Sequence, residues 1–458
     1  MNNELIRIKE IMPGIERDIS PTFCLAKWHH VTIYLQTGET HSCYHPAPHK
    51  IPLEGLEQNP SQLHNTPQKK QERLAMLNGE KPAGCQYCWN IECMGKDYVS
   101  DRHIKTSSIY TPERIEEIKT NPWDYDINPE YIEVNFSNEC NFKCGYCHPK
   151  FSSRYYSEIK QNGPYKDSTE HRNDIDWFEL YEEDANPYVD AWWKWWPEVS
   201  KTLNILRVTG GEPLMHKSTW RLFDELEQNP KPHLNIELNS NMGVKPAMVR
   251  RLVERVKDLK QKGCINNFKL YTSIDTWGKR AEYTRTGLDI ELWERNLDYY
   301  LTSTGWPVTF MVTFNLFVVT SFDLLLEKIL EWRTKYNTDA NETQWQRVRF
   351  DTPYLKEPLQ FDMNILPKDE FLPYMEKHLK FIKDNMDDND RTKFSSLEYE
   401  RFRRTIDYMK NTTYDQDKVV KGMRNFYSWF TEYDKRRNTN IVETFPELKK
   451  FYEDCSNV

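Results

Sequence analysis

The chain has 458 residues, which is enough for two or three domains with buried cores and excludes a small disulfide-rich or zinc-finger-only protein. Its 62 Lys and Arg residues against 70 Asp and Glu residues give a formal net charge of -8, without the basic excess that a dedicated duplex-binding protein needs, so nucleic acid is an unlikely partner. Eight of the ten cysteines lie between Cys24 and Cys147, and this clustering carries most of the functional information.

The compartment decides how the cysteines are interpreted, because oxidising compartments favour disulfides and reducing ones favour metal sites. Residues 1–20 carry charges throughout and contain no apolar core of a signal peptide, and the chain has no apolar run long enough to cross a membrane. A mean hydropathy of -0.83 agrees with a soluble protein. We therefore expect a cytoplasmic protein with no membrane partner, in which the cysteine cluster binds metal.

Residues 1–125 are expected to form a small cysteine-rich domain. The apolar run at residues 31–35 predicts a strand of a hairpin. The polar stretch at residues 45–70, rich in Pro, Gln, Asn and His, predicts a long irregular connection. Only a metal or a neighbouring domain would hold such a connection in place.

Residues 126–360 alternate between short strand-like runs and longer stretches with helical periodicity. The predicted strands are residues 131–136, 203–208, 234–238, 268–274, 308–319 and 347–350. The predicted helices are residues 219–227, 246–260, 290–301 and 322–335. This alternation predicts parallel βαβ units, and so an α/β fold with an open sheet or a full or partial barrel whose chemistry lies at the carboxyl ends of the strands.

Residues 361–458 are charged and have a helical pattern. Tyr, Phe and Arg recur through residues 374–409 and 423–435, and no catalytic signature is present there. We expect a helical C-terminal extension that packs against the preceding domain, with a role in substrate binding as the alternative.

Three cysteines follow the first predicted strand in a C-x3-C-x2-C run: Cys140, Cys144 and Cys147. Three thiolates on one loop can ligate three irons of a [4Fe–4S] cluster and leave the fourth iron open to a substrate or cofactor. A zinc loop is the alternative, although zinc normally takes four protein ligands. With the aromatic residue Tyr146 directly before the third cysteine, the run resembles the signature of the radical S-adenosylmethionine (radical SAM) superfamily.

Two further loops resemble the same superfamily. The sequence TGGEP at Thr209–Pro213 follows the second predicted strand, where the family carries its GGEP motif, and Asn239–Gly243 resembles the family's TNG loop. Glycines let the backbone approach a ligand closely, and a glutamate accepts hydrogen bonds from an ammonium group. In the family the GGEP loop binds the methionyl amino group. The positions that the resemblance assigns to SAM binding here are Tyr146, Gly210, Gly211, Glu212, Pro213 and Asn241.

The fourth predicted strand ends at Ser273 and Asp275, and Arg285 follows. This pattern resembles the SxDG...R block of peptide-modifying radical enzymes, in which the Ser and the Arg hold the ribose and the carboxylate of SAM. Thr276 stands where the family has Gly. In the alternative interpretation, Asp275 caps a helix and Arg285 is solvated. Asn315, in the fifth strand, is a further candidate to approach the adenosine.

The resemblance covers about residues 128–355 and implies a partial (β/α)6 TIM-type barrel. It implies SAM and a [4Fe–4S] cluster on Cys140, Cys144 and Cys147 as catalytic cofactors, with an external one-electron donor of flavodoxin or ferredoxin type. It also implies reductive cleavage of SAM to methionine and a 5'-deoxyadenosyl radical, which abstracts a hydrogen atom from the substrate. Such a radical needs a site that excludes water.

The remaining N-terminal cysteines also form a pattern, in which Cys24, Gly38 and Cys43 make a C-x13-G-x4-C run and Cys85-x2-Cys88 follows. The pattern resembles the Twitch domain, the shorter relative of the SPASM domain, and implies that Cys24, Cys43, Cys85 and Cys88 hold a second, auxiliary [4Fe–4S] cluster for electron transfer or structural support. In the family this module follows the barrel, whereas here it precedes it. A structural zinc site is the alternative.

The other cysteines are outside these two motifs. Cys93 could replace one of the four ligands, supply a proton or thiol near the substrate, or be buried as a small hydrophobe. Cys264 and Cys455 are expected to be ordinary thiols. The histidines among residues 29–49 are not needed as ligands, because four thiolates already suffice for a cluster.

The resemblance implies a radical SAM oxidoreductase. We expect oxidation or crosslinking of a peptide or protein, with modification of a small molecule such as a sugar, cyclitol or nucleotide as the alternative. A non-catalytic iron–sulfur or RNA-binding scaffold is a third possibility. Asp275, Asp351 and Tyr354, near the predicted strand ends, are candidates for a catalytic acid or base.

Overall fold

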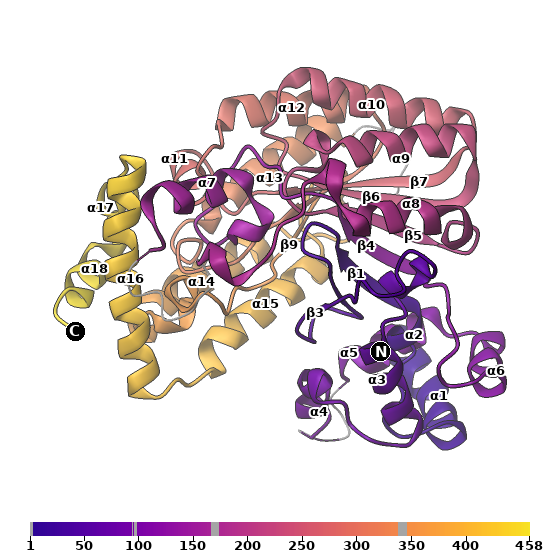
Figure 1. The fold of residues 1–458 in the computed structure, drawn as a ribbon. Coiled ribbons are helices and arrows are strands. Elements are labelled where there is room, and N and C mark those ends of the chain that lie inside the picture. The colour runs from indigo at the N-terminus through magenta and orange to yellow at the C-terminus, as the bar shows by residue number, and fades with distance from the viewer. Residues whose placement is uncertain (1–2, 94, 96–98, 166–173, 338–345) are drawn as a thin grey trace. The chain divides into compact units, whose positions relative to one another are not determined.

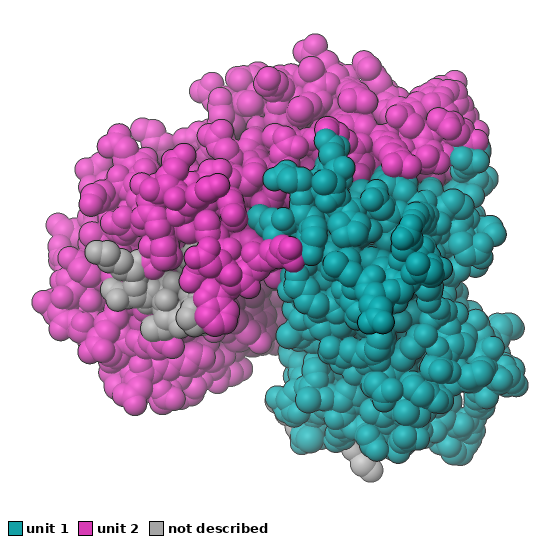
Figure 2. Space-filling model, viewed as in Figure 1, with its two compact units in different colours: residues 1–137, 180–208, 229–236 teal, residues 138–179, 209–228, 237–458 magenta. Residues whose placement is uncertain are grey.

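The computed structural model describes residues 3–93, 95, 99–165, 174–337 and 346–458, which fold into two compact units (Figure 2). Unit 1 comprises residues 1–137, 180–208 and 229–236, and unit 2 comprises residues 138–179, 209–228 and 237–458. Each unit therefore combines segments that are far apart in the sequence. The three predicted domains, residues 1–125, 126–360 and 361–458, stay a prediction.

Nine strands form a sheet in the order β3-β2-β1-β4-β5-β6-β7-β8-β9. They are β1 (His30–Tyr34), β2 (Glu39–His41), β3 (His49–Lys50), β4 (Tyr131–Asn135), β5 (Ile205–Thr209), β6 (Lys231–Ser240), β7 (Ile265–Ser273), β8 (Val308–Met311) and β9 (Val348–Asp351). The pairs β1–β4, β7–β8 and β8–β9 are parallel, whereas β2 is antiparallel to β1 and β3. Strands β4 to β9 stand in sequence order, as successive βαβ units place them. The predicted α/β class is confirmed.

Four helices of unit 2 lie where the periodicity predicted them: α9 (Lys217–Gln228), α10 (Pro246–Gln261), α12 (Ile290–Ser303) and α13 (Phe322–Tyr336). Two others, α7 (Ser153–Asn162) and α11 (Lys279–Thr284), were not predicted. In Figure 1, α9, α10 and α12 lie side by side, and α10 packs on β7. The buried residues Val249, Val253 and Val256 recur at helical spacing on the inner face of α10, which is why the sequence predicted this helix well.

The fifth predicted strand, residues 308–319, is wrong in its second half, because β8 ends at Met311. Beyond it, the backbone N–H of Thr313 donates to the Asp275 carboxylate at 2.9 Å. The Asn315 side chain then closes a turn by donating to the Thr313 carbonyl and accepting from the Phe317 N–H. The apolar residues 316–319 are buried in this turn, so their hydrophobicity reflects burial without a strand.

The irregular connection predicted for residues 45–70 is largely confirmed, because up to residue 66 it contains only the short strand β3 and one 3-10 turn, Pro60–Leu63. Elsewhere, unit 1 is largely helical, which the sequence analysis did not predict (Figure 1). Its helices are α1 (Asn3–Asp18), α2 (Ala26–His29), α3 (Pro67–Leu77), α4 (Gln86–Cys93), α5 (Asp101–Ile109), α6 (Pro112–Thr120) and the later α8 (Pro187–Val199). Side chains such as Met12, Phe23 and Trp28 form a hydrophobic core of this region. The start of α3 has a common capping arrangement: the Thr66 hydroxyl accepts the Lys69 N–H, and Pro67 occupies the first turn.

The C-terminal part of unit 2 is helical, as expected. It contains α14 (Lys368–Asp384), α15 (Ser396–Asn411), α16 (Gln416–Arg437), α17 (Ile441–Thr444) and α18 (Lys449–Cys455). A capping box between Ser395 and Glu398 starts α15. In the described part of the chain, no helix combines the length and the apolar character needed to cross a bilayer.

Candidate functional site

The three cysteines of the C-x3-C-x2-C run lie on the loop that follows β4 in the chain. Cys140 and Cys144 are 8% and 9% exposed, and Cys147 is half-buried. Burial raises the pKa of Cys140 well above its usual value. The Phe142 N–H, which donates to the Cys140 sulfur at 3.4 Å, lowers this pKa. Negative charge on Cys144 and Cys147 would raise it further. In the chain alone, burial and the neighbouring cysteines therefore favour the neutral thiol of Cys140.

Glycines hold this loop in place. The Phe142 ring packs against Gly243, where a Cβ atom would lie 2.3 Å from its Cζ atom. At Gly287, with φ +110°, a Cβ atom would lie 2.8 Å from the Asn141 carbonyl oxygen. Only glycine fits at these two positions without a shift of neighbouring atoms, and no motif in the sequence marks Gly287.

The TGGEP loop has the geometry that its glycines allow. Gly210 and Gly211 have φ values of +76° and +49°, which other residues rarely adopt. The Glu212 side chain is fully buried, and Pro213 begins the next short helical turn. Burial raises the pKa of Glu212 to about 7, while hydrogen bonds to its carboxylate favour the charged form.

The loop Asn239–Gly243 connects Glu212 to the cysteine loop. The Glu212 carboxylate accepts the Asn241 N–H at 2.6 Å and the Ser240 hydroxyl at 2.8 Å. The Asn241 side-chain amide donates to Asn141 at 2.8 Å and faces the Cys140 sulfur at 3.9 Å. The structure thus brings two of the predicted SAM-binding residues and the first cysteine together.

Met242, in the same loop, has a φ of +55°, an unusual value for a residue other than glycine. Its N–H donates to the Ser240 hydroxyl at 3.0 Å, and its carbonyl accepts the Asn296 side-chain amide at 2.8 Å. Backbone strain of this kind persists where the surroundings hold it and is common at functional sites.

Asp275, Arg285 and Tyr146 form a buried network. Arg285 contacts both carboxylate oxygens of Asp275, and the Tyr146 hydroxyl donates to Asp275 at 2.6 Å. Arg285 is 5% exposed, so the alternative with a solvated arginine is wrong. Ser273 is the last residue of β7 and lies opposite Met311 in the ladder. The roles of these residues in SAM binding stay predictions.

The other candidates lie elsewhere in unit 2. Asn315 uses its amide on its own turn. Asp351 lies 3.8 Å from Arg401, and Tyr354 stacks on Tyr408 with 3.9 Å between ring centroids. Their predicted roles in adenosine binding and proton transfer stay untested.

Arg437 and Tyr433, at the C-terminal end of α16, contact the cysteine loop and were missed by the sequence analysis. Arg437 donates to the Lys143 carbonyl at 2.6 Å and pairs with Glu158 at 3.0 Å, and its side chain is fully buried. Burial raises the pKa of Cys144, whereas the positive charges of Arg285 and Arg437 act in the opposite direction. Basic residues in a last helical turn are common, so the sequence offered no signal for this contact.

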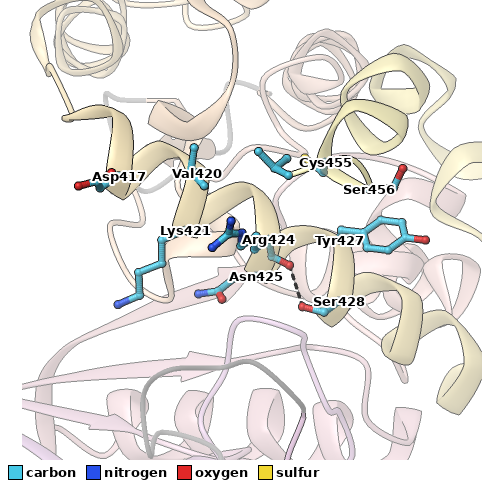
Figure 3. Close-up of a pocket in the computed structure, with 10 residues that line it drawn as sticks. Asp417, Val420, Lys421, Arg424, Asn425, Tyr427, Ser428, Cys455 and Ser456 are labelled. Carbon is cyan, nitrogen blue, oxygen red and sulfur yellow. Dashed lines mark hydrogen bonds between the residues drawn. The ribbon is translucent and has the colours of Figure 1, made fainter.

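Another part of α16 lines a groove of about 720 Å³ with residues around the end of α18 (Figure 3). The groove has mixed charge from Asp417, Lys421 and Arg424, and the Ser428 hydroxyl donates to the Arg424 carbonyl at 2.7 Å. Ser428 lies about 13 Å along the helix axis from Arg437. The groove and the cysteine loop therefore use different parts of the same helix.

In unit 1, the four remaining motif cysteines line one cavity: Cys24, Cys43, Cys85 and Cys88. They come from the segment before α2, the end of the β1–β2 hairpin, and the start of α4; Gly38, with φ +63°, makes the hairpin turn. Burial raises the pKa of Cys24, Cys85 and Cys88 to about 11 each.

Polar groups also line this four-cysteine cavity. The Ser42 hydroxyl is buried and has no hydrogen-bond partner among the described residues. Lys27, which lines the cavity, is 2% exposed and lies 2.5 Å from the Glu72 carboxylate. Thiolates are the usual protein ligands of iron–sulfur clusters, and the sulfurs of such clusters accept hydrogen bonds.

Two further observations bear on metal binding. Cys93 is exposed, so its interpretation as a buried hydrophobe is wrong. His45 pairs with Asp101 at 2.8 Å and stacks on Tyr87. Over the residues that the structure describes, no three or more His, Cys, Asp or Glu side chains are arranged to hold a metal ion.

Comparisons with known proteins give little further information. No family model matches the chain, and no curated protein matches it. A solved structure described as "Native anSMEcpe with bound AdoMet" matches with a TM-score of 0.36 and 14% sequence identity, over 56% of this chain and 61% of that chain. A likeness this weak does not bear on the function of this chain.

Proposed function

We propose that the chain is a radical SAM enzyme whose catalytic site is built on the Cys140–Cys147 loop of unit 2. The observation that carries the proposal is the position of Asn241, which binds the Glu212 carboxylate through its N–H and faces the Cys140 sulfur with its side-chain amide. Two motifs separated by about seventy residues of sequence therefore meet at one residue, through its backbone and its side chain. The finer arrangement of β4–β9 as a partial (β/α)6 barrel belongs to the same proposal.

Two side chains of this site, Glu212 and Arg285, keep hydrogen-bonding groups with which SAM would be bound. A [4Fe–4S] cluster on the three thiolates would supply the electron that cleaves SAM to methionine and a 5'-deoxyadenosyl radical, which takes a hydrogen atom from the substrate. Glu212 accepts three hydrogen bonds from the chain, and a carboxylate has about four acceptor positions, which leaves one for the methionyl ammonium.

Arg285 likewise has donors to spare. Asp275 uses two of about five N–H groups of its guanidinium, so the others are available to the SAM carboxylate. Asp275 fixes the plane of the guanidinium, and the ring of Tyr146 lies 5.4 Å beneath it. A buried arginine that is oriented in advance binds a carboxylate with less loss of side-chain freedom.

The four-cysteine cavity of unit 1 is proposed to hold an auxiliary [4Fe–4S] cluster, in the manner of a Twitch domain, with structural zinc as the alternative. The support is the set of four thiols on one cavity together with the unsatisfied Ser42 hydroxyl. Such a cluster would accept the second electron when a substrate is oxidised by two electrons.

For the substrate we propose a peptide or protein that is oxidised or crosslinked, and a small molecule remains the alternative. An external flavodoxin- or ferredoxin-type protein would supply the electron. Mass spectrometry of candidate substrates after reaction is expected to show a loss of about two mass units, because two hydrogen atoms leave. An unchanged mass for every peptide tested would favour the small-molecule alternative.

The binding part of the proposal is tested by spectroscopy. Anaerobic protein reconstituted with iron and sulfide and reduced by one electron per cluster with dithionite is expected to show a cluster EPR signal that changes when SAM is added, because SAM binds the open iron. The control is the Glu212→Gln variant, which keeps the three cysteines and should need more SAM for the same change. A signal that does not respond to SAM at any concentration would contradict the proposal.

A further inference from the structure

The backbone of the cysteine loop is bound from two directions within unit 2. Lys143 N–H donates to the Thr286 carbonyl at 2.8 Å and Gly145 N–H donates to the Thr284 carbonyl at 3.1 Å, so residues 284–286 hold one edge. From α16, Arg437 donates to the Lys143 carbonyl at 2.6 Å and to the Thr286 hydroxyl at 3.0 Å. One arginine therefore ties together the loop and the segment that supports it.

Tyr433, one helical turn before Arg437, closes the same contact. Its hydroxyl donates to the Tyr283 carbonyl at 2.5 Å and shares a hydrogen bond with Thr286 at 2.9 Å. A Cβ atom at Gly145 would lie 3.0 Å from its ring, so the loop approaches α16 at a glycine between two of the cysteines. The Arg437 guanidinium stacks on the Tyr433 ring at 4.0 Å.

The charges around this contact do not balance. Arg437 and Lys143 both pair with Glu158, whose side chain is 3% exposed, while the Arg437 side chain is fully buried. Two cations thus face one carboxylate, although the Lys143 side chain is 25% exposed and so partly solvated, whereas Arg437 is fully buried. Arg285 is already paired with Asp275. Buried positive charge is costly unless an anion compensates it. The excess lies next to Cys144, where a thiolate-bound iron–sulfur site would place negative charge.

We propose that Arg437 is a positioning residue of the catalytic loop: it fixes the loop backbone from α16 and supplies the buried positive charge that compensates the anionic cluster. The inference rests on the proposed function, because it assumes a cluster on Cys140, Cys144 and Cys147. The C-terminal helices then take part in the active site and are more than a packing cap.

The neighbouring Arg436 provides a matched control. It has the same charge, lies on the same turn of α16, and its side chain is 6% exposed. Its partners are Glu432 at 2.8 Å and the Gly163 carbonyl at 2.9 Å, at the end of α7, and not the cysteine loop. Removal of this arginine costs comparable packing without touching the loop.

The test uses the full chain, reconstituted with iron and sulfide, and follows the EPR signal that responds to SAM. Arg437→Gln is expected to shift the reduction potential of this cluster to more negative values, because reduction adds negative charge and the variant lacks the cation that stabilises it. The variant is also expected to release iron to a chelator several-fold faster. Arg437→Lys keeps the charge, so its potential should stay near that of the wild type while its iron release is still faster. Arg436→Gln should change neither quantity.

The possible outcomes separate a failure of this inference from a failure of the proposed function. If Arg437→Gln matches Arg436→Gln in potential and in iron release, the inference is wrong. If the wild-type chain shows no SAM-responsive cluster, the proposed function itself fails, whatever the variants do. If Arg437→Gln does not fold, Arg437→Lys and Tyr433→Phe test the inference in its place. Both should lose iron faster than Arg436→Gln. Equal rates of iron release from these three variants would overturn the inference.

Discussion

Arg285 contacts both carboxylate oxygens of Asp275 through separate nitrogens, with Nη2–Oδ1 at 2.8 Å and Nε–Oδ2 at 3.0 Å. The two side chains are 6% and 0% exposed. The Tyr146 hydroxyl and the Thr313 N–H donate to the same carboxylate at 2.6 Å and 2.9 Å. One carboxylate therefore fixes the end of the cysteine loop, the turn after β7 and the chain after β8.

Asp275→Asn is expected to lower the free energy of unfolding by about 3 kcal/mol, because it leaves the Arg285 charge buried without a partner. Urea unfolding measures this change. Arg280 and Glu447 form a half-exposed pair at 2.8 Å, and Glu447→Gln should cost less than about 1 kcal/mol. Equal losses in the two variants would show that the buried network contributes no more than a surface pair.

Glu212 predicts a pH dependence of stability. Its pKa in the folded chain is about 7, above the ordinary value of 4.5, because of burial. The folded chain therefore binds this proton more tightly than the unfolded chain, and the free energy of unfolding falls as the pH rises from about 4.5 to about 7, by on the order of 3 kcal/mol.

Glu212→Gln cannot titrate and should lack this fall. Urea midpoints of the wild type and the variant, measured across that pH range without added SAM, give the comparison. If the urea midpoints of the wild type and the variant change with pH in parallel, Glu212 does not titrate in this pH range.

The sequence predicted the parts of the fold that depend on local periodicity. The strands β4–β7 and β9 and the helices α9, α10, α12 and α13 lie within a few residues of their predicted positions, because their buried residues recur at strand or helix spacing. The predicted strand at residues 308–319 was too long because an apolar turn has no period that distinguishes it from a strand.

The chemistry-bearing motifs could also be recognised, since they are contiguous in the sequence. The contacts that join them could not: Arg437 binds the Lys143 carbonyl across almost three hundred residues, and Asn241 links Glu212 to Cys140 only in the folded chain. The core of the N-terminal region was missed because its helices are short and polar on average, so packing and not propensity stabilises them.

Gly287→Ala should loosen the cysteine loop. Its Cβ atom would meet the Asn141 carbonyl oxygen at 2.8 Å and the Phe142 Cα atom at 3.1 Å, and backbone atoms cannot move aside like a side chain. Gly263→Ala is the control, because that glycine also has a positive φ, +68°, but nothing within 4 Å of the added atom. We expect Gly263→Ala to lose about 1 kcal/mol of stability from backbone strain alone, and Gly287→Ala to lose more because of the added clash and to be the variant that also loses iron from the loop. Full iron retention by Gly287→Ala would contradict the placement of the loop.

The four-cysteine cavity of unit 1 predicts the metal content. With two [4Fe–4S] clusters the anaerobically purified chain should hold about eight irons, and Cys85→Ser about four. The exposed Cys93 gives the control, since Cys93→Ser should keep all of the iron. About four irons and one zinc in the wild type, measured by elemental analysis, would replace the auxiliary cluster with a structural zinc site.

SAM cleavage is the reaction that the proposed function requires most directly. The reconstituted chain, reduced under anaerobic conditions and mixed with SAM, is expected to release 5'-deoxyadenosine and methionine, as measured by liquid chromatography and mass spectrometry. Cys264→Ala, which removes a buried thiol outside the motifs, should release as much, and Cys144→Ala none. No 5'-deoxyadenosine from the wild type with any reductant, or undiminished release by Cys144→Ala, would contradict the proposed radical chemistry.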